Sequence, residues 1–284
     1  MASTTAVTTE TSRTALPARP VAEVGVSGHR GASAELPENT LAAFRRALEH
    51  GAEGIELDVA LSADGVAVVL HDTTVDRTTD GSGAVADLTL AELRALDAGD
   101  GEPVPTLDEV LALAAGRAEV NIEIKAADAA PAVAEVVARH PGLTWFASSG
   151  QWDALEELQR LVPGARVYPL TLGVATTEQL RALAVAAGYD AAAFSDELDR
   201  FSHLGRGLDD ALAFATRVGA AGVSIWAEGL GAADVDRIHA AGLEAWVWTV
   251  DDLDRAEELM RMGVDAICTD IPAGVLARRA LVTG

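Results

Sequence analysis

The sequence is poor in cysteine, in basic residues and in long apolar runs. Its single cysteine, Cys268, cannot form an internal disulfide; this is typical of a reducing compartment, and we expect a cytoplasmic protein. No window approaches about 18 consecutive apolar residues without charges, so we expect no membrane span. Only 21 Lys and Arg stand against 44 Asp and Glu, which gives a net charge of −23. This charge argues against nucleic acid and anionic membranes as partners.

The N-terminal stretch also lacks an apolar run. Its first 23 residues are rich in Thr, Ala and Pro, and they resemble neither a signal peptide nor a membrane anchor. We therefore expect a disordered tail over residues 1–23 and one folded domain over residues 24–284. A single α/β barrel of about 250 residues accounts for a domain of that length.

Short apolar runs alternate with helical patterns along the folded part, which predicts parallel strands joined by crossover helices. After the second predicted strand, SADG predicts a hairpin turn, and residues 73–105 follow as a small insertion with a short helix. Residues 176–219 show two helical patterns around an irregular stretch. The eight predicted strands are residues 24–27, 55–59, 120–125, 143–147 and 166–170, and the runs GVSIW, LEAWVWTV and VDAICTD.

Acidic residues occupy one face of two predicted strands. In GIELDVAL, Glu56 and Asp58 alternate with aliphatic residues, so both carboxylates point to the same side. In EVNIEIKA, Asn121, Glu123 and Lys125 likewise share a face. A buried pair of acids needs a proton or a cation, and hard oxygen ligands suit Mg²⁺ or Ca²⁺. Glu123 could complete a cation site of three carboxylates with Glu56 and Asp58.

Two histidines fall where predicted strands end. His29 follows VGVSG and His71 ends VAVVLHD, and a histidine pair near a cation is typical of acid and base catalysis near neutral pH. Each feature alone has a simpler interpretation. Alternating acids can form the solvent-exposed face of an edge strand, and a lone histidine is more often structural than catalytic. A solvated face, however, gives no reason for the acids and both histidines to gather at strand ends.

The motifs HRG, PENT, E-x-D, HD, RTTDGSG and EIK, in this order and spacing, resemble the glycerophosphodiester phosphodiesterase family. The resemblance extends from about residue 24 to the TDIP at residues 269–272. It implies an α/β fold, a (β/α)₈ TIM barrel with a small insertion after strand 2, whose active face lies at the carboxyl ends of the strands. It also implies metal-dependent hydrolysis of small glycerophosphodiesters to sn-glycerol 3-phosphate and an alcohol.

The resemblance implies a role for each candidate residue. It makes His29 and His71 the acid and base pair, and it gives one divalent cation, Mg²⁺ or Ca²⁺, to the three acids. It assigns substrate binding to Arg30, Lys125 and Trp248, although Trp248 could equally pack inside the barrel. Because so acidic a surface repels phosphate at long range, the site must be locally positive, and the cation with Arg30 and Lys125 would supply that charge. Which histidine is the base, and whether a glycerol hydroxyl or water attacks the phosphorus, stay open.

Two alternative functions are compatible with the same motifs. A barrel similar to lysophospholipase D would act on lysolipids at a membrane, and it would need an apolar entrance or a basic docking face. A binding barrel without catalysis predicts at least one broken catalytic position, and here none is missing. Headgroup preference and oligomeric state do not follow from the sequence.

Overall fold

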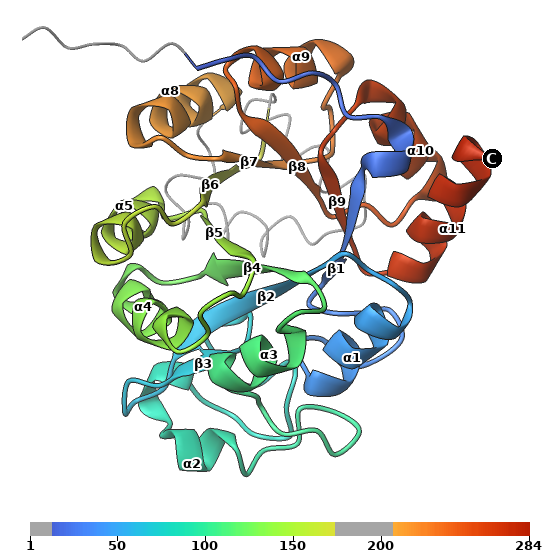
Figure 1. Cartoon of the computed structure of the whole chain (residues 1–284). Coiled ribbons are helices and arrows are strands. Elements are labelled where there is room, and N and C mark those ends of the chain that lie inside the picture. The colour runs from blue at the N-terminus through green and yellow to red at the C-terminus, as the bar shows by residue number, and fades with distance from the viewer. Residues whose placement is uncertain (1–12, 174–206) are drawn as a thin grey trace, which may run out of the picture.

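A closed β-barrel forms the centre of the molecule (Figure 1). The computed structural model describes residues 13–173 and 207–284, and in them eight parallel strands run in the order β1-β9-β8-β7-β6-β5-β4-β2, closed by the pairing of β1 with β2. The predicted (β/α)₈ barrel is thus confirmed. The parallel strands are β1 (Gly25–His29), β2 (Gly54–Leu61), β4 (Glu119–Ile124), β5 (Trp145–Ser149), β6 (Val167–Thr171), β7 (Gly222–Trp226), β8 (Glu244–Trp248) and β9 (Ala266–Thr269).

Helices cover the outside of the barrel, and local capping explains where several of them begin. The Thr40 side chain accepts a hydrogen bond from Ala43 N, and Thr106 and Glu109 form a capping box. Among the described helices, none is both long and apolar enough to cross a membrane. The helices are α1 (Leu41–Glu49), α2 (Leu90–Leu93), α3 (Leu107–Ala114), α4 (Ala130–Ala138), α5 (Trp152–Leu161), α8 (Leu208–Val218), α9 (Ala232–Ala240), α10 (Leu253–Met262) and α11 (Pro272–Thr283).

The two faces of the strands have different surroundings. The aliphatic residues that alternate along β2 and β4, such as Ile55 and Ile122, are fully buried in the main hydrophobic core with residues of the helices. A separate buried cluster contains Phe146, Trp246 and Cys268 together with Tyr168. The Phe146 and Trp246 ring centroids lie 5.4 Å apart. Trp246 therefore packs with the aromatic residues of neighbouring strands.

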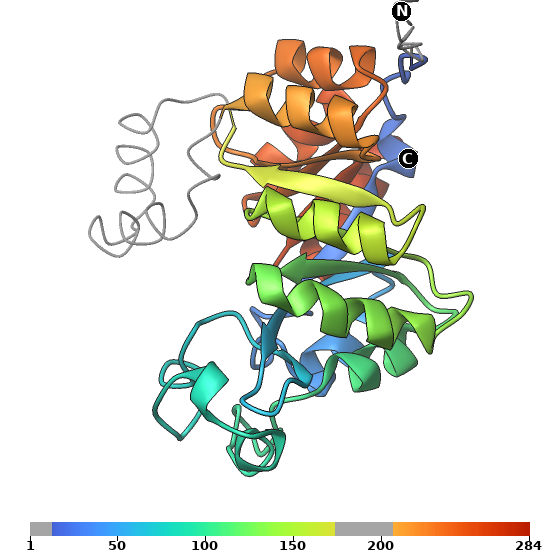
Figure 2. The ribbon, with the colours of Figure 1, turned by 90° about the vertical axis from the view of Figure 1, so that its left-hand side faces the viewer.

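The predicted insertion follows β3 (Ala67–Val69), which pairs antiparallel with β2. The hairpin brings the chain back to the level of Asp58 in β2, because Leu70 N donates to Asp58 O at 3.0 Å. The insertion stands out from the barrel in Figure 2, where it is coloured turquoise. A small hydrophobic cluster of its own holds it together: Val68, Leu70, Val75, Val85, Leu93, Ala98 and Val104.

Part of the stretch assigned to a disordered tail is structured. Residues 13–23 lie against the barrel, with Arg13 Nη1 donating to Ala220 O at 2.6 Å and Leu16 N donating to His239 O at 2.9 Å. These contacts use backbone carbonyls, which composition does not reveal. Gly242 and Gly263 allow the close approach, since a Cβ at either would lie 2.7 Å from Thr14 O or Ala18 Cβ. Residues 1–12 lie outside the described part.

Other differences from the sequence prediction are small. The first strand continues to His29, and the fourth is shifted to Trp145–Ser149 from the predicted residues 143–147. The second helical pattern of residues 176–219 forms α8. The first pattern and the irregular stretch, up to residue 206, lie outside the described residues.

Candidate active site

The strand register brings the predicted acids together at one end of the barrel. His29 pairs with Glu56 across β1 and β2, and Asp58 pairs with Glu123 across β2 and β4. Carboxylate oxygens of Glu56, Asp58 and Glu123 all lie within 4.8 Å of one another. Glu56 and Asp58 are only 2% and 0% exposed, so these charges lie away from solvent. The cluster is compatible with a divalent cation.

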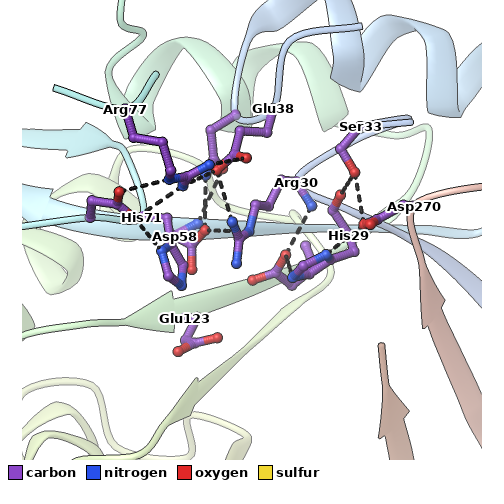
Figure 3. A network of polar contacts seen from close by, with 12 residues as sticks. His29, Arg30, Ser33, Glu38, Asp58, His71, Arg77, Glu123 and Asp270 are labelled. Carbon is purple, nitrogen blue, oxygen red and sulfur yellow. Dashed lines mark hydrogen bonds and ion pairs between the residues drawn. The ribbon is translucent and has the colours of Figure 1, made fainter. Parts of the chain in front are cut away.

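Two cations lie among the acids, as Figure 3 shows for Arg30. The Arg30 Nε atom is 3.2 Å from Asp58 Oδ2, and the Lys125 Nζ atom is 3.1 Å from Asp58 Oδ1. Lys125 Nζ also donates to Glu123 Oε1 at 2.6 Å, and the Arg30 backbone N donates to Glu56 Oε2 at 3.0 Å. Three carboxylates against two cations leave one negative charge if all five groups are ionised.

The acids respond differently to burial. Burial raises the pKa of Glu56 well above its usual range, and the charges of Asp58 and Glu123 raise it further. Burial also disfavours the Asp58 anion, but Lys125 and Arg30 outweigh this effect and hold the pKa of Asp58 below its usual range. The Glu56 Oε1 atom is buried without a hydrogen-bond partner among the described residues. A buried carboxylate oxygen without a hydrogen-bond partner, close to two further acids, is suited to bind a cation.

Asn39 is a site residue that the sequence did not assign. Its Nδ2 donates to Asp58 Oδ2 at 2.8 Å, and its Oδ1 accepts a hydrogen bond from Asp58 N at 3.4 Å. Its backbone has a φ of +59°, a conformation that asparagine tolerates better than most residues. The PENT motif therefore presents an amide that orients the Asp58 carboxylate.

His29 is bonded to an acid from the far end of the chain. Its Nδ1 lies 2.7 Å from Asp270 Oδ1, and its Nε2 lies 4.0 Å from Glu56 Oε2. Ser33 Oγ lies 2.8 Å from both Asp270 Oδ1 and His29 O. Burial opposes ionisation of Asp270, but its hydrogen bond to His29 prevails, so the pKa of Asp270 is lowered. Asp270 is not among the site residues predicted from the sequence.

His71 has a carboxylate partner next to it in the sequence. Its Nδ1 lies 2.7 Å from Asp72 Oδ1, and this contact lowers the pKa of Asp72. Adjacent residues of a strand point to opposite faces, but β3 ends at Val69, so this rule does not separate His71 from Asp72. Arg77 from the insertion bonds to Asp72, with Nε 2.8 Å from Oδ2.

Trp248 lies at the carboxyl end of β8, and its Nε1 is buried without a hydrogen-bond partner among the described residues.

Histidines outside the site also form hydrogen bonds to carboxylates: His50 to Glu35, and His140 to Asp108. His239 bonds to Asp265 beside the N-terminal segment. These contacts give the three histidines a structural role, and His203 lies outside the described residues.

A parallel barrel that gathers acids, histidines and cations at the carboxyl ends of its strands is the architecture of a barrel enzyme. The model of the glycerophosphoryl diester phosphodiesterase family matches residues 29–273. A glycerophosphodiester phosphodiesterase of Caldanaerobacter subterraneus is 34% identical over 261 residues, which cover 87% of this chain and 94% of that protein. The chain belongs to the glycerophosphodiester phosphodiesterase family and is an enzyme.

Solved structures agree with this assignment. A phosphodiesterase of Oleispira antarctica in complex with the product sn-glycerol 3-phosphate has a TM-score of 0.71 at 28% identity, covering 89% of this chain and 96% of that one. A glycerophosphodiester phosphodiesterase of Agrobacterium tumefaciens has a TM-score of 0.68 at 31% identity, covering 89% and 99%. The similarity therefore extends over nearly the whole barrel.

Proposed function

We propose that the protein hydrolyses glycerophosphodiesters to sn-glycerol 3-phosphate and an alcohol in a metal-dependent reaction, with His29 and His71 as the acid and base pair. One observation carries the proposal: a single end of the barrel holds three clustered carboxylates, two largely buried cations and two histidines that each contact their own carboxylate. The product bound to the Oleispira antarctica relative supports the choice of substrate class.

Glu56, Asp58 and Glu123 would hold the divalent cation, Mg²⁺ or Ca²⁺. When bound, the cation supplies Lewis-acid stabilisation of the negative charge on the phosphoryl oxygens. The charge balance favours this arrangement. Three carboxylates and two cationic side chains sum to −1, so a divalent cation would offset the negative charge of this cluster and let it bind an anionic phosphodiester.

Arg30 and Lys125 would bind phosphate oxygens. Both are largely buried, with side chains 16% and 13% exposed, and the surrounding acids raise the pKa of each above its usual range although burial opposes this. They therefore stay charged at any pH at which the enzyme works. In a protein with a net charge of −23, they give the substrate a locally positive site.

The two histidines would transfer protons through Nε2, since Nδ1 of each is bonded to a carboxylate that fixes the ring. One removes a proton from the attacking oxygen, which belongs either to a glycerol hydroxyl of the substrate or to water. The new P–O bond forms as the bond to the alcohol breaks, and the other histidine donates a proton to the leaving oxygen. Attack by the hydroxyl gives a cyclic phosphate that water then opens to the same product. Trp248 would cover the glycerol carbons with its indole ring.

The test is release of sn-glycerol 3-phosphate from glycerophosphocholine and glycerophosphoethanolamine, with Mg²⁺, with Ca²⁺ and with EDTA. We expect release that needs a metal and that His29→Ala abolishes. His140→Ala is the matched control, because His140 also bonds to an aspartate, Asp108, but belongs to a different part of the surface.

No release with any metal would contradict the proposal. Turnover of lysophosphatidylcholine in preference to glycerophosphocholine, with binding to vesicles, would favour the alternative of a lysolipid phosphodiesterase. The cytoplasmic location and the absence of nucleic-acid partners stay predictions.

A further inference from the structure

A single guanidinium group from the insertion holds two carboxylates of the site. Arg77 donates from Nε and Nη2 to the two oxygens of Asp72, at 2.8 and 3.0 Å. It also donates from Nη1 and Nη2 to the two oxygens of Glu38, both at 2.8 Å. Arg77 lies beside Glu38 and above His71 in Figure 3. Two-point contacts of this kind fix direction as well as distance, which lysine cannot reproduce.

The two carboxylates serve different parts of the site. Asp72 Oδ1 lies 2.7 Å from Nδ1 of His71, the proposed acid or base. Glu38 Oε1 accepts a hydrogen bond at 2.8 Å from Nη1 of Arg30, the proposed phosphate ligand. A continuous chain of contacts therefore joins the histidine to the phosphate-binding arginine, and Arg77 is its middle member.

Arg77 lies on a loop of the insertion that is fixed by hydrogen bonds and by a buried side chain. Val75 is fully buried in the small core of the insertion, and its backbone N donates to Gly83 O at 3.0 Å. Thr79 N donates to Val75 O at 3.1 Å, and Gly83 N donates to Asp76 Oδ2 at 3.0 Å. These contacts close the loop on both sides of Arg77. The Arg77 guanidinium is thus held in place by the folded insertion.

We propose that Arg77 is a positioning residue, which fixes the His71–Asp72 pair relative to the Arg30–Glu38 pair and makes the insertion part of the catalytic apparatus. This inference rests on the proposed function. Arg77 is 48% exposed, so solvent screens its ion pairs, and they contribute less to the stability of the fold than buried ion pairs would. Its loss should therefore disturb the geometry of the site much more than the stability of the protein.

The test compares Arg77→Ala and Arg77→Lys with Arg94→Ala, all with Mg²⁺ and glycerophosphocholine. Arg94 is the matched control, since it also lies in the insertion and bonds to a carboxylate, Glu109, at 2.6 Å. We expect Arg77→Ala to lower kcat about 10- to 100-fold, as the loss of a residue that orients a ligand or base usually does, and to raise KM by a smaller factor. Arg94→Ala should match the wild type. Arg77→Lys should stay defective, because it keeps the charge but not the two-point contacts.

Two further measurements separate positioning from folding. Free guanidinium ion at millimolar concentration should restore part of the activity of Arg77→Ala but not change that of Arg94→Ala, since the half-exposed position is open to a small ion. Nitrogen NMR of the His71 ring should show a change of tautomer or exchange in Arg77→Ala alone. The unfolding temperature of all three variants should stay close to that of the wild type.

The inference is overturned if Arg77→Ala or Arg77→Lys retains the kcat and KM of the wild type. It is also overturned if activity falls together with the unfolding temperature, without rescue by guanidinium and without a change at His71. A wild type that releases no glycerol 3-phosphate would instead contradict the proposed function, and the NMR comparison would still test the link between Arg77 and His71.

Discussion

The hydrogen bond between Asp270 and His29 gives the sharpest prediction about catalysis. Asp270→Asn keeps an oxygen that can accept from His29 Nδ1 and from Ser33 Oγ, which lie 2.7 and 2.8 Å from Asp270 Oδ1. The substitution therefore removes the negative charge and leaves the shape almost unchanged. Asp270→Ala removes both the charge and the contact. Comparing the two variants separates two effects of Asp270 on the His29 ring: its negative charge stabilises the protonated ring, and its hydrogen bond orients the ring.

The magnitude follows from the type of bond. A hydrogen bond to a charged group contributes about 1.5–3 kcal/mol, and each 1.4 kcal/mol changes a rate about tenfold. The Asp270 side chain is 33% exposed, so solvent screening places the loss near the lower end of this range. We expect kcat to fall about tenfold in Asp270→Asn and about 30-fold or more in Asp270→Ala, with little change in KM.

Steady-state kinetics with glycerophosphocholine and saturating metal measures these losses. Asp108→Asn is the matched control, because Asp108 also bonds to a histidine, His140, at 3.0 Å and lies on another part of the surface. Wild-type kcat in both Asp270 variants would refute the reasoning. Equal losses in Asp270→Asn and Asp270→Ala would show that the charge alone matters.

Two predictions concern stability. Because the pKa of Glu56 is raised in the folded protein, stability without metal should fall as pH rises above the usual Glu pKa of 4.5. Glu56→Gln should therefore unfold at a higher temperature than the wild type at pH 7 in EDTA, by about 2 °C for each kcal/mol of free energy of unfolding gained. The same variant should lose activity. An unfolding temperature of Glu56→Gln below that of the wild type would contradict this prediction. Gly31→Ala should destabilise the fold by about 2 kcal/mol or more, since its φ is +91° and a Cβ would lie 2.5 Å from Ala43 C. Gly51→Ala, at φ +88° with open space around it, is the control and should cost about 1 kcal/mol in chemical denaturation.

Residues that lie within one strand period could be predicted from the sequence. Glu56 and Asp58 share a face because side chains alternate along a strand, and Glu123 joins them because parallel strands end at the same edge. The barrel itself follows from the same alternation of strands and helices. These features depend on local periodicity, which a single sequence displays.

Contacts between distant segments were not predictable in the same way. Asp270 lies 241 residues from His29, and no local pattern links them. Asn39 and Arg77 reach the site from loops, where side-chain direction has no period. The ordered residues 13–23 were missed for another reason, because they bind mainly to backbone carbonyls, which every sequence carries.

The two histidines thus depend on the fold to different degrees. The His71–Asp72 contact joins neighbours in the sequence, and Arg77 holds Asp72 in place. The His29–Asp270 contact instead depends on closure of the barrel, since β1 pairs with β9 and Gly28 lies opposite Thr269. His29 and Asp270 directly follow these two residues and therefore lie side by side. The last strand therefore has to join the first before His29 acquires its carboxylate. Acid and base function should appear together only when the whole barrel has closed, so a chain that lacks β9 and α11 would keep the His71–Asp72 sequence but not a working pair.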